Sequence, residues 1–179
     1  MKKLPISKLN DFFSAVSKAG NKVYLPVDLG EGKGADYKLW EEGVELSKAL
    51  NTNRSAKDFF FPQTENLFEL KMDGKNIDVI DTRTEAEDFV VFGVRACDVR
   101  SFDILDRVFL ANPVDTYYKN RREHGVIISL ACTKLAHTCF CHQMDVDATN
   151  AGGDIQTWIA EDTLYLEALT EKGKALLAK

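Results

Sequence analysis

Apolar and polar positions follow two different periods near the start of the chain, which predicts a helix followed by a hairpin. Residues 7–19 carry apolar side chains at helical spacing, with Ser7 as the expected N-cap and Gly20 as the expected end. Residues 22–27 and 35–39 have the composition and alternation of strands. The glycine-rich loop between them predicts that they pair as a hairpin.

Turn residues divide much of the remaining chain and predict further short elements. Residues 67–80 hold two apolar runs on either side of an Asp-Gly turn, and residues 157–166 hold two more around a Glu-Asp pair. Both segments are therefore expected to be hairpins. Ser55 is the expected cap of a short helix, and a last helix is expected at 170–177 with Thr170 as its N-cap.

The segment 88–131 contains the pattern that decides the topology. An apolar run, an apolar helical stripe and a second apolar run follow one another, which is typical of a parallel βαβ crossover. Asp98 or Ser101 is the expected cap of the helix. We therefore expect an α/β or α+β fold, in which a mixed sheet contains this unit and is joined by flanking helices and by hairpins at both ends of the chain.

The four cysteines fall where this topology would bring them together. Cys97 follows the first strand of the crossover, Cys132 follows the second, and Cys139 and Cys141 lie in the loop that begins there. The carboxyl ends of neighbouring parallel strands meet at one edge of a sheet, and open parallel sheets bind their ligands at that edge. The four thiols are thus expected to share one site.

Four thiolates are the usual ligand set of an iron–sulfur cluster. In an extended segment 139–141, both sulfurs would point to one side and the ring of Phe140 would point away and shield the site. A helix N-terminus, together with Arg95 and Arg100, would favour the thiolate form of Cys97. The residue types are therefore suited to holding a metal cluster.

The spacing leaves other interpretations open. Free cysteine is often buried as a small hydrophobe, so ordinary packing is the alternative to any metal site. The spacing Cys-x6-Cys-x-Cys matches neither the common zinc-finger pattern nor the ferredoxin runs, and iron–sulfur is preferred to zinc without excluding it. His137 and His142 flank the same loop and would either ligate a metal or hydrogen-bond near it, whereas His124 is expected on the surface.

Composition and charge exclude several classes of protein. Lys plus Arg number 23 and Asp plus Glu 28, which gives a net charge of −5, and the one basic cluster, Lys119, Arg121 and Arg122, is expected to be a solvated helix end. No nucleic-acid partner is therefore expected. The apolar runs are far shorter than the ~18 residues of a membrane span, and no signal-peptide core is present, so we expect a cytoplasmic protein. The length predicts a single domain, 1–179.

Five short motifs occur together in the chain. They are Phe61-Pro-Gln-Thr-Glu65, Gly93-Val-Arg-Ala-Cys-Asp98, Asp115-Thr-Tyr-Tyr-Lys-Asn-Arg-Arg122, Cys132 and Thr138-Cys-Phe-Cys141. In combination they resemble the N-terminal domain of the iron–sulfur electron-transfer subunits of anaerobic sulfite reductase and of sulfhydrogenase, where it is the β subunit. The resemblance covers most of the chain.

The resemblance implies a cofactor, a ligand set and a role. The cofactor is an iron–sulfur cluster of the 4Fe-4S type. The implied ligands are Cys97, Cys132, Cys139 and Cys141, with Arg95 and Asp98 as supporting groups. In that family a ferredoxin-like module with two Cys-x2-Cys-x2-Cys-x3-Cys runs follows this domain, and the protein relays electrons between a flavin-containing partner and a catalytic subunit.

Such ferredoxin runs are missing from this sequence. We therefore expect the N-terminal domain of a longer iron–sulfur subunit or a stand-alone relative, serving a soluble anaerobic oxidoreductase as a component rather than as a catalyst on its own. Two other functions stay open. A docking domain whose cysteines bind zinc or nothing should expose an apolar surface larger than about a few hundred Å². A thiol redox protein would use Cys97 and would lower the pKa of that thiol.

Overall fold

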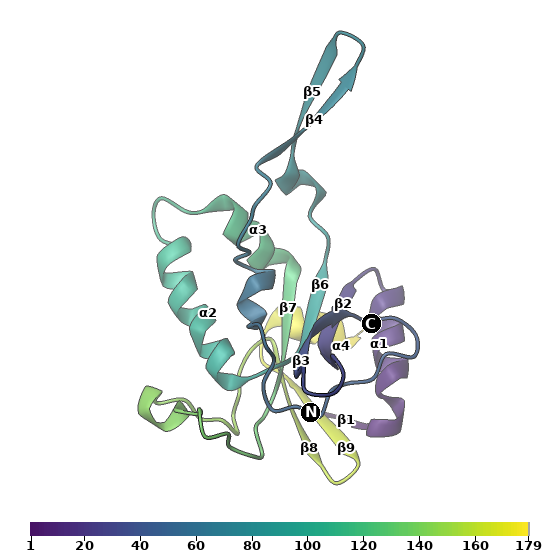
Figure 1. The fold of residues 1–179 in the computed structure, drawn as a ribbon, viewed down its shortest axis with the longest axis vertical. Helices are drawn as coiled ribbons and strands as arrows, with labels where there is room; N and C mark the ends of the chain where they lie inside the picture. The colour runs from purple at the N-terminus through teal and green to yellow at the C-terminus, as the bar shows by residue number, and fades with distance from the viewer. Residues whose placement is uncertain (179) are drawn as a thin grey trace.

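The computed structural model describes the backbone of residues 1–178 and the side chains of residues 1–83 and 86–178. A seven-stranded mixed sheet forms the centre of the molecule, and a separate two-stranded sheet projects from it (Figure 1). In spatial order the central sheet consists of β1 (Lys2–Pro5), β9 (Thr163–Ala168), β8 (Ile155–Ala160), β7 (Gly125–Leu130), β6 (Phe89–Val94), β2 (Lys22–Asp28) and β3 (Ala35–Leu39). The projecting sheet consists of β4 (Phe68–Asp73) and β5 (Asn76–Asp81).

The topology agrees with the sequence pattern. The four central strands β8, β7, β6 and β2 run parallel, and β1, β9 and β3 run antiparallel to their neighbours. β6 pairs with β7 in parallel from Phe89 opposite Gly125, which confirms the βαβ unit predicted at 88–131. The three predicted hairpins are also present, as β2–β3, β4–β5 and β8–β9.

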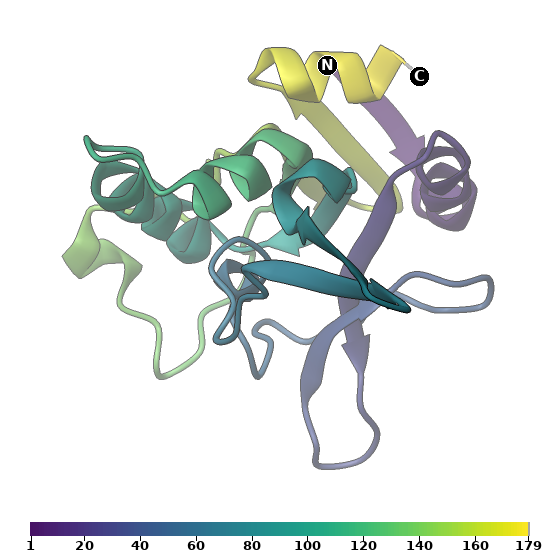
Figure 2. The ribbon, with the colours of Figure 1, turned by 90° about the horizontal axis from the view of Figure 1, so that it is seen from above.

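Helices cover both faces of the central sheet (Figure 2). They are α1 (Leu9–Lys18), α2 (Ala96–Phe109), α3 (Thr116–His124) and α4 (Glu171–Ala178), with the short 3-10 turns η1 (Ile6–Lys8), η2 (Ala56–Phe59), η3 (Thr82–Glu85) and η4 (Cys141–Met144). One core packs α1 and α4 against the sheet, and a second core packs η2, α2 and α3 against the opposite face. Within residues 1–178 no helix has the length and apolarity that a bilayer crossing requires.

Strand β6 contributes to both cores because its side chains alternate between the faces. Val90 and Phe92 lie in the core beneath α1, and Val91 lies in the core beneath α2. Gly93, with φ of +82°, forms a bulge, and Val94 therefore returns to the side of Val91. The bulge sets the direction in which the chain leaves the sheet and enters α2.

Three predicted helix boundaries are confirmed. The Ser55 hydroxyl accepts a hydrogen bond from the amide of Lys57 at 3.2 Å, and the Thr170 hydroxyl accepts one from the amide of Gly173 at 3.2 Å. Gly20 adopts a φ of +91° just past the end of α1, a conformation that favours glycine.

Three residues that were expected to cap helices do not do so. α1 begins after η1, and Ser7 lies inside η1 without a capping hydrogen bond. Neither Asp98 nor Ser101 caps α2, because the helix begins earlier and its N-cap position is Arg95. Since only one residue separates β6 from α2, Cys97 lies in the first helical turn.

The basic cluster on α3 was expected to be solvated, and this prediction is wrong for two of its three members. Arg121 forms an ion pair with Glu65 at 2.6 Å. Arg122 donates to both carboxylate oxygens of Asp106 at 2.9 Å, and its guanidinium lies 5.4 Å from the centres of two buried phenylalanine rings. Only Lys119 is exposed, so the cluster ties α3 to neighbouring segments.

Candidate functional site

The parallel pairing of β6 and β7 places two cysteines at the same edge of the sheet. Cys97 lies in the first turn of α2, directly after β6. Cys132 lies two residues beyond β7 and donates its amide hydrogen to the carbonyl of Ala148 at 2.9 Å. Cys139 and Cys141 belong to the long connection that leaves this edge and returns at β8.

Electrostatic coupling indicates that the four thiols share one neighbourhood. Partial burial raises the pKa of Cys97, and the charges of Asp98, Cys141 and Cys132 raise it further. Burial also raises the pKa of Cys132, and the charges of Cys141 and Cys139 act in the same direction. The four residues therefore lie close enough for each thiolate to disfavour its neighbours, as expected for sulfurs that converge on one positive centre.

The arrangement does not form a closed metal site. Among the described residues, no group of three or more His, Cys, Asp or Glu side chains is positioned to hold a metal ion. All four cysteines are free thiols, with Cys97 exposed and the other three partly buried. The donor set fits an iron–sulfur cluster by chemistry, since it provides the four thiols that such clusters use.

Arg95 is the main cation of this edge. Its guanidinium donates to the carbonyls of residues 49–50 and 130–131 at distances of 2.8 to 3.4 Å. The same positive charge lowers the pKa of Cys132, against the effect of burial. Arg95 therefore holds two chain segments against the end of β7 and also favours the thiolate of Cys132.

Asp98 acts in the opposite direction on its neighbour. Its carboxylate accepts a hydrogen bond from Ser55 at 2.7 Å and pairs with Lys57 at 3.3 Å, so it links η2 to α2. Its negative charge helps to raise the pKa of Cys97. The lowered pKa that was expected for Cys97 at a helix N-terminus is therefore wrong, because burial and neighbouring negative groups oppose the thiolate.

The segment 139–141 was expected to be extended, and it is a turn. The amide of Cys139 donates to the carbonyl of Ala136 at 3.0 Å, and the amide of Ala136 donates to the sulfur of Cys139 at 3.3 Å. The turn η4 begins at Cys141. Phe140 is 59% exposed, so its ring does not shield the thiols.

The histidines add little to this site. His137 and His142 are both exposed. His124 lies far along the chain on α3 and contacts Asp88 at 2.7 Å, while keeping about a third of its side chain in solvent. The expectation that His124 lies near the surface is consistent with this position.

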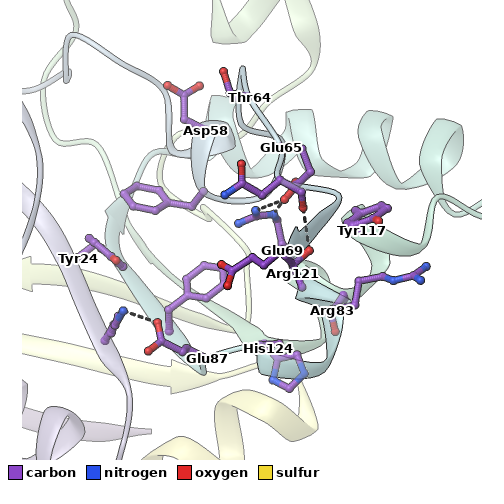
Figure 3. Close-up of a pocket in the computed structure, with 17 residues that line it drawn as sticks. Tyr24, Asp58, Thr64, Glu65, Glu69, Arg83, Glu87, Tyr117, Arg121 and His124 are labelled. Carbon is purple, nitrogen blue, oxygen red and sulfur yellow. Dashed lines mark hydrogen bonds and ion pairs between the residues drawn. The ribbon is translucent and has the colours of Figure 1, made fainter. Parts of the chain in front are cut away.

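A second hollow lies at the opposite edge of the sheet, where the parallel strands begin (Figure 3). This cavity of about 510 Å³ contains an ion pair between Arg121 and Glu65 and another between Lys22 and Glu87. The sequence analysis missed it, because partners such as Glu65 and Arg121 lie 56 residues apart and form no local motif. Its opposite charges pair with each other, which indicates a structural junction.

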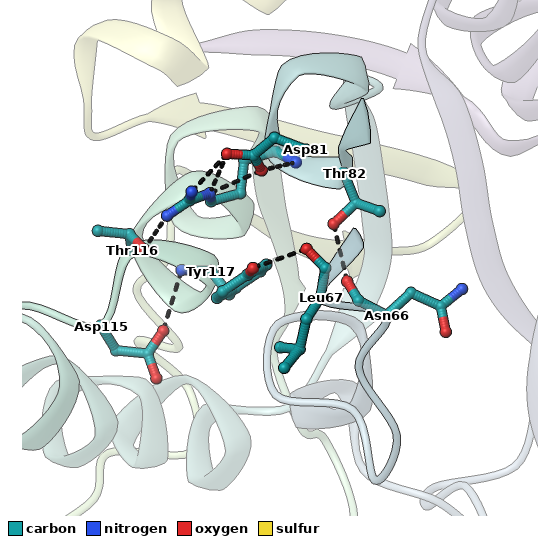
Figure 4. Close-up of polar contacts among 8 residues, drawn as sticks. Asn66, Leu67, Asp81, Thr82, Asp115, Thr116 and Tyr117 are labelled. Atoms are coloured by element: carbon teal, nitrogen blue, oxygen red, sulfur yellow. Dashed lines mark hydrogen bonds and ion pairs between the residues drawn. The ribbon is translucent and has the colours of Figure 1, made fainter. Parts of the chain in front are cut away.

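The junction anchors the base of the projecting hairpin (Figure 4). The Tyr117 hydroxyl donates to the carbonyl of Leu67 at 2.8 Å, and Arg83 donates to the hydroxyl of Thr116 at 2.7 Å. These contacts join both ends of the β4–β5 hairpin to the start of α3. The hairpin is therefore fixed at its base while its strands extend beyond the body of the molecule (Figure 1).

The fold and the thiol edge define an α/β domain with a thiol-rich site at the carboxyl ends of parallel strands. Neither a family model nor a solved structure matches the chain. Over 148 residues, or 81% of its length, the chain is 31% identical to sulfhydrogenase 2 subunit beta of Pyrococcus furiosus. The aligned part spans 41% of that protein. The match supports the sulfhydrogenase beta-subunit family to which the sequence motifs pointed.

Proposed function

We propose that this domain transfers electrons through an iron–sulfur cluster as part of a hydrogenase-type or sulfite-reductase-type oxidoreductase subunit. The observation that carries the proposal is the convergence of four thiols, from three separate segments, on the carboxyl edge of β6 and β7. Similarity to a protein named as a sulfhydrogenase subunit supports the same role.

The proposed ligands are Cys97, Cys132, Cys139 and Cys141, and the bound cluster would supply one-electron transfer. The chain's own residues would position it and set its charge. Arg95 would offset part of the negative charge of the thiolates and hold the segments that carry them. The amide of Ala136, which already donates to the sulfur of Cys139, would stabilise that ligand as a thiolate.

The proposed partners follow from the family resemblance. A flavin-containing subunit would deliver or accept electrons on one side, and a catalytic subunit would do so on the other. The matched relative is by its name one subunit of a sulfhydrogenase. The domain itself would bind no substrate, and its contribution would be to place the cluster between these partners.

One of the two alternative functions has an observation in its favour. Six large apolar side chains at and within the projecting hairpin are more than half exposed, as a subunit-docking domain would require. The second alternative, a thiol redox protein that uses Cys97, is disfavoured because the pKa of this thiol is raised. A reactive thiol requires the opposite shift.

The deciding experiment measures iron, acid-labile sulfide and zinc in protein purified without oxygen. We expect about four irons and four sulfides per chain, and an electron paramagnetic resonance signal after reduction with dithionite. Protein that contains zinc, or that stays free of metal after cluster reconstitution, would overturn the proposal in favour of a docking domain.

Each ligand can be tested by a serine substitution. We expect Cys97→Ser, Cys132→Ser, Cys139→Ser and Cys141→Ser each to lower the iron content and weaken the cluster absorbance, because a hydroxyl is a poorer ligand for iron than a thiolate. Thr138→Ser, at an exposed neighbouring position, is the matched control and should retain full iron. Unchanged iron in one cysteine variant would remove that residue from the ligand set.

A further inference from the structure

The projecting hairpin has one apolar face that nothing in the described chain covers. Its cross-strand register places Leu70 opposite Val79 and Met72 opposite Ile77, so these side chains share a face. That face consists of Phe68, Leu70, Met72, Ile77 and Val79, which are 56 to 73% exposed. A two-stranded hairpin is at best marginally stable alone in water, and an apolar surface of this kind marks an interaction site.

The outer edge of β4 is open. Within the described residues, β4 pairs only with β5, and no other segment forms a backbone hydrogen bond with it. A two-residue turn closes the hairpin, so the pair Asp73 and Asn76 is bonded and the pairs alternate from there. The backbone groups of Phe68, Leu70 and Met72 therefore face away from β5 and are available to another strand.

We propose that β4 pairs antiparallel with β4 of a second copy of this chain, with Leu70 at the two-fold axis. In this register, Glu69 of each copy lies opposite Lys71 of the other, which forms two complementary charge pairs. Phe68 of each copy lies opposite Met72 of the other. The result is a four-stranded sheet in which the apolar faces of both hairpins become continuous.

The other edge of the hairpin disfavours the same kind of pairing. Antiparallel pairing of β5 with its own copy would place Asp78 opposite Asp78, or Ile77 opposite Asp81, depending on the register. Like charges directly opposite each other are destabilising, and charges on an edge strand block further pairing. The assembly would therefore close at two copies instead of growing along the sheet.

The base of the hairpin supports this assembly. The contacts from Tyr117 to Leu67 and from Arg83 to Thr116 fix the ribbon before a second copy arrives, which reduces the entropy lost on binding (Figure 4). The strands are only six residues long, so the contact is small beside the ~1,600 Å² of a standard interface. We therefore expect a dimer whose population rises with concentration.

Sedimentation equilibrium on the full chain tests the proposal. The apparent mass should rise with concentration from 20.1 kDa toward twice that value. Glu69→Lys should keep the protein monomeric by placing two lysines opposite each other, and adding Lys71→Glu to that variant should restore the dimer. Glu42→Lys makes the same charge change at an exposed loop position and should leave the dimer intact.

A mass of one chain at every concentration would overturn the proposal and leave the apolar face to an unlike partner. A dimer that Glu69→Lys does not weaken would also overturn it, since this variant changes the proposed charge pair. These outcomes are separate from the proposed electron transfer, because the mass measurement makes no use of iron content.

Cysteine cross-linking tests the register independently of the charges. Hydrogen-bonded partners in an antiparallel sheet have Cα atoms ~5.5 Å apart, which is within the range of a disulfide. Leu70→Cys should therefore yield a covalent dimer under mild oxidation, above the level of the unmodified chain. Val79→Cys lies on the same face but on the outer strand of the proposed sheet and should not cross-link. Equal cross-linking of both variants would contradict the register.

Discussion

At the scale of single residues, the arginine of α3 that packs against the core shows how a charge can be kept away from water. Arg122 forms a two-point pair with Asp106, which also accepts a hydrogen bond from the Tyr118 hydroxyl at 2.6 Å. Burial opposes the ionisation of Asp106, but the hydrogen bonds from Arg122 and Tyr118 outweigh it and lower the pKa of this carboxyl. The pair therefore stabilises the folded state while Asp106 is ionised.

Replacing this arginine should reveal the stabilising effect and its dependence on pH. We expect Arg122→Met to reduce the free energy of unfolding by about 2 kcal/mol at neutral pH, because it leaves a half-buried carboxylate without its cation. The stability from the lowered pKa is present above the unfolded value of about 4 and is lost as pH falls through the folded value. The difference between wild type and variant in urea unfolding should therefore shrink in acid.

A difference between the two proteins that stays constant from neutral pH down into the acid range would contradict this account. It would mean that the packing of Arg122 against the phenylalanine rings, and not its charge, supplies the stability. Lys119→Met, on the exposed side of the same helix, is the matched control and should change the stability by less than about 0.5 kcal/mol.

At the scale of elements, α4 depends on one close approach of backbones. The buried carboxylate of Asp154 accepts hydrogen bonds from the amide of Ile127 at 2.9 Å and from the hydroxyl of Thr170 at 2.6 Å. Gly173 lies so close to the Asp154 carbonyl that a side chain there would collide with backbone atoms. The glycine thus allows α4 to pack directly on the start of β8.

Gly173→Ala should therefore destabilise the protein although alanine favours helices. The gain in helix propensity is about 1 kcal/mol, and the collision with Asp154 should exceed it, so we expect a net loss of about 2 kcal/mol in the free energy of unfolding. Urea unfolding measures this loss. Lys174→Ala is the matched control at an exposed position of the same helix and should change the stability by less than about 0.5 kcal/mol. A Gly173→Ala variant as stable as wild type would show that α4 can shift without loss.

The periodic patterns of the sequence predicted the elements better than their ends. Strands β6 and β7 and all three hairpins follow from apolar runs and turn residues, because these features depend on local chain chemistry. The start of α2 was misplaced, since a bulge at Gly93 shortens the connection and no local pattern reports it. The cysteine edge was expected from the parallel crossover, whereas the pairing of Glu65 with Arg121 depends on a tertiary contact that the local sequence does not encode.

At the scale of the whole molecule, the two proposed sites lie at opposite ends of the same strand. The β4–β5 hairpin precedes the start of β6, and the thiols gather beyond its end (Figure 1). The central sheet and its two cores separate the sites. Since the hairpin pairs with no strand of the central sheet, we expect each site to form without the other.

Removing the hairpin tests this independence. Residues 66 and 82 are joined by a hydrogen bond of 2.7 Å from the Thr82 hydroxyl to the Asn66 carbonyl, so a short glycine–serine linker can replace residues 68–81. Because the deleted residues lie outside both cores, the free energy of unfolding should change by no more than about 1 kcal/mol. We expect the iron content of the anaerobically purified protein to be unchanged and the mass to be that of one chain at every concentration. Iron that is lost together with the hairpin would contradict this independence and show that the projecting sheet supports the thiol site.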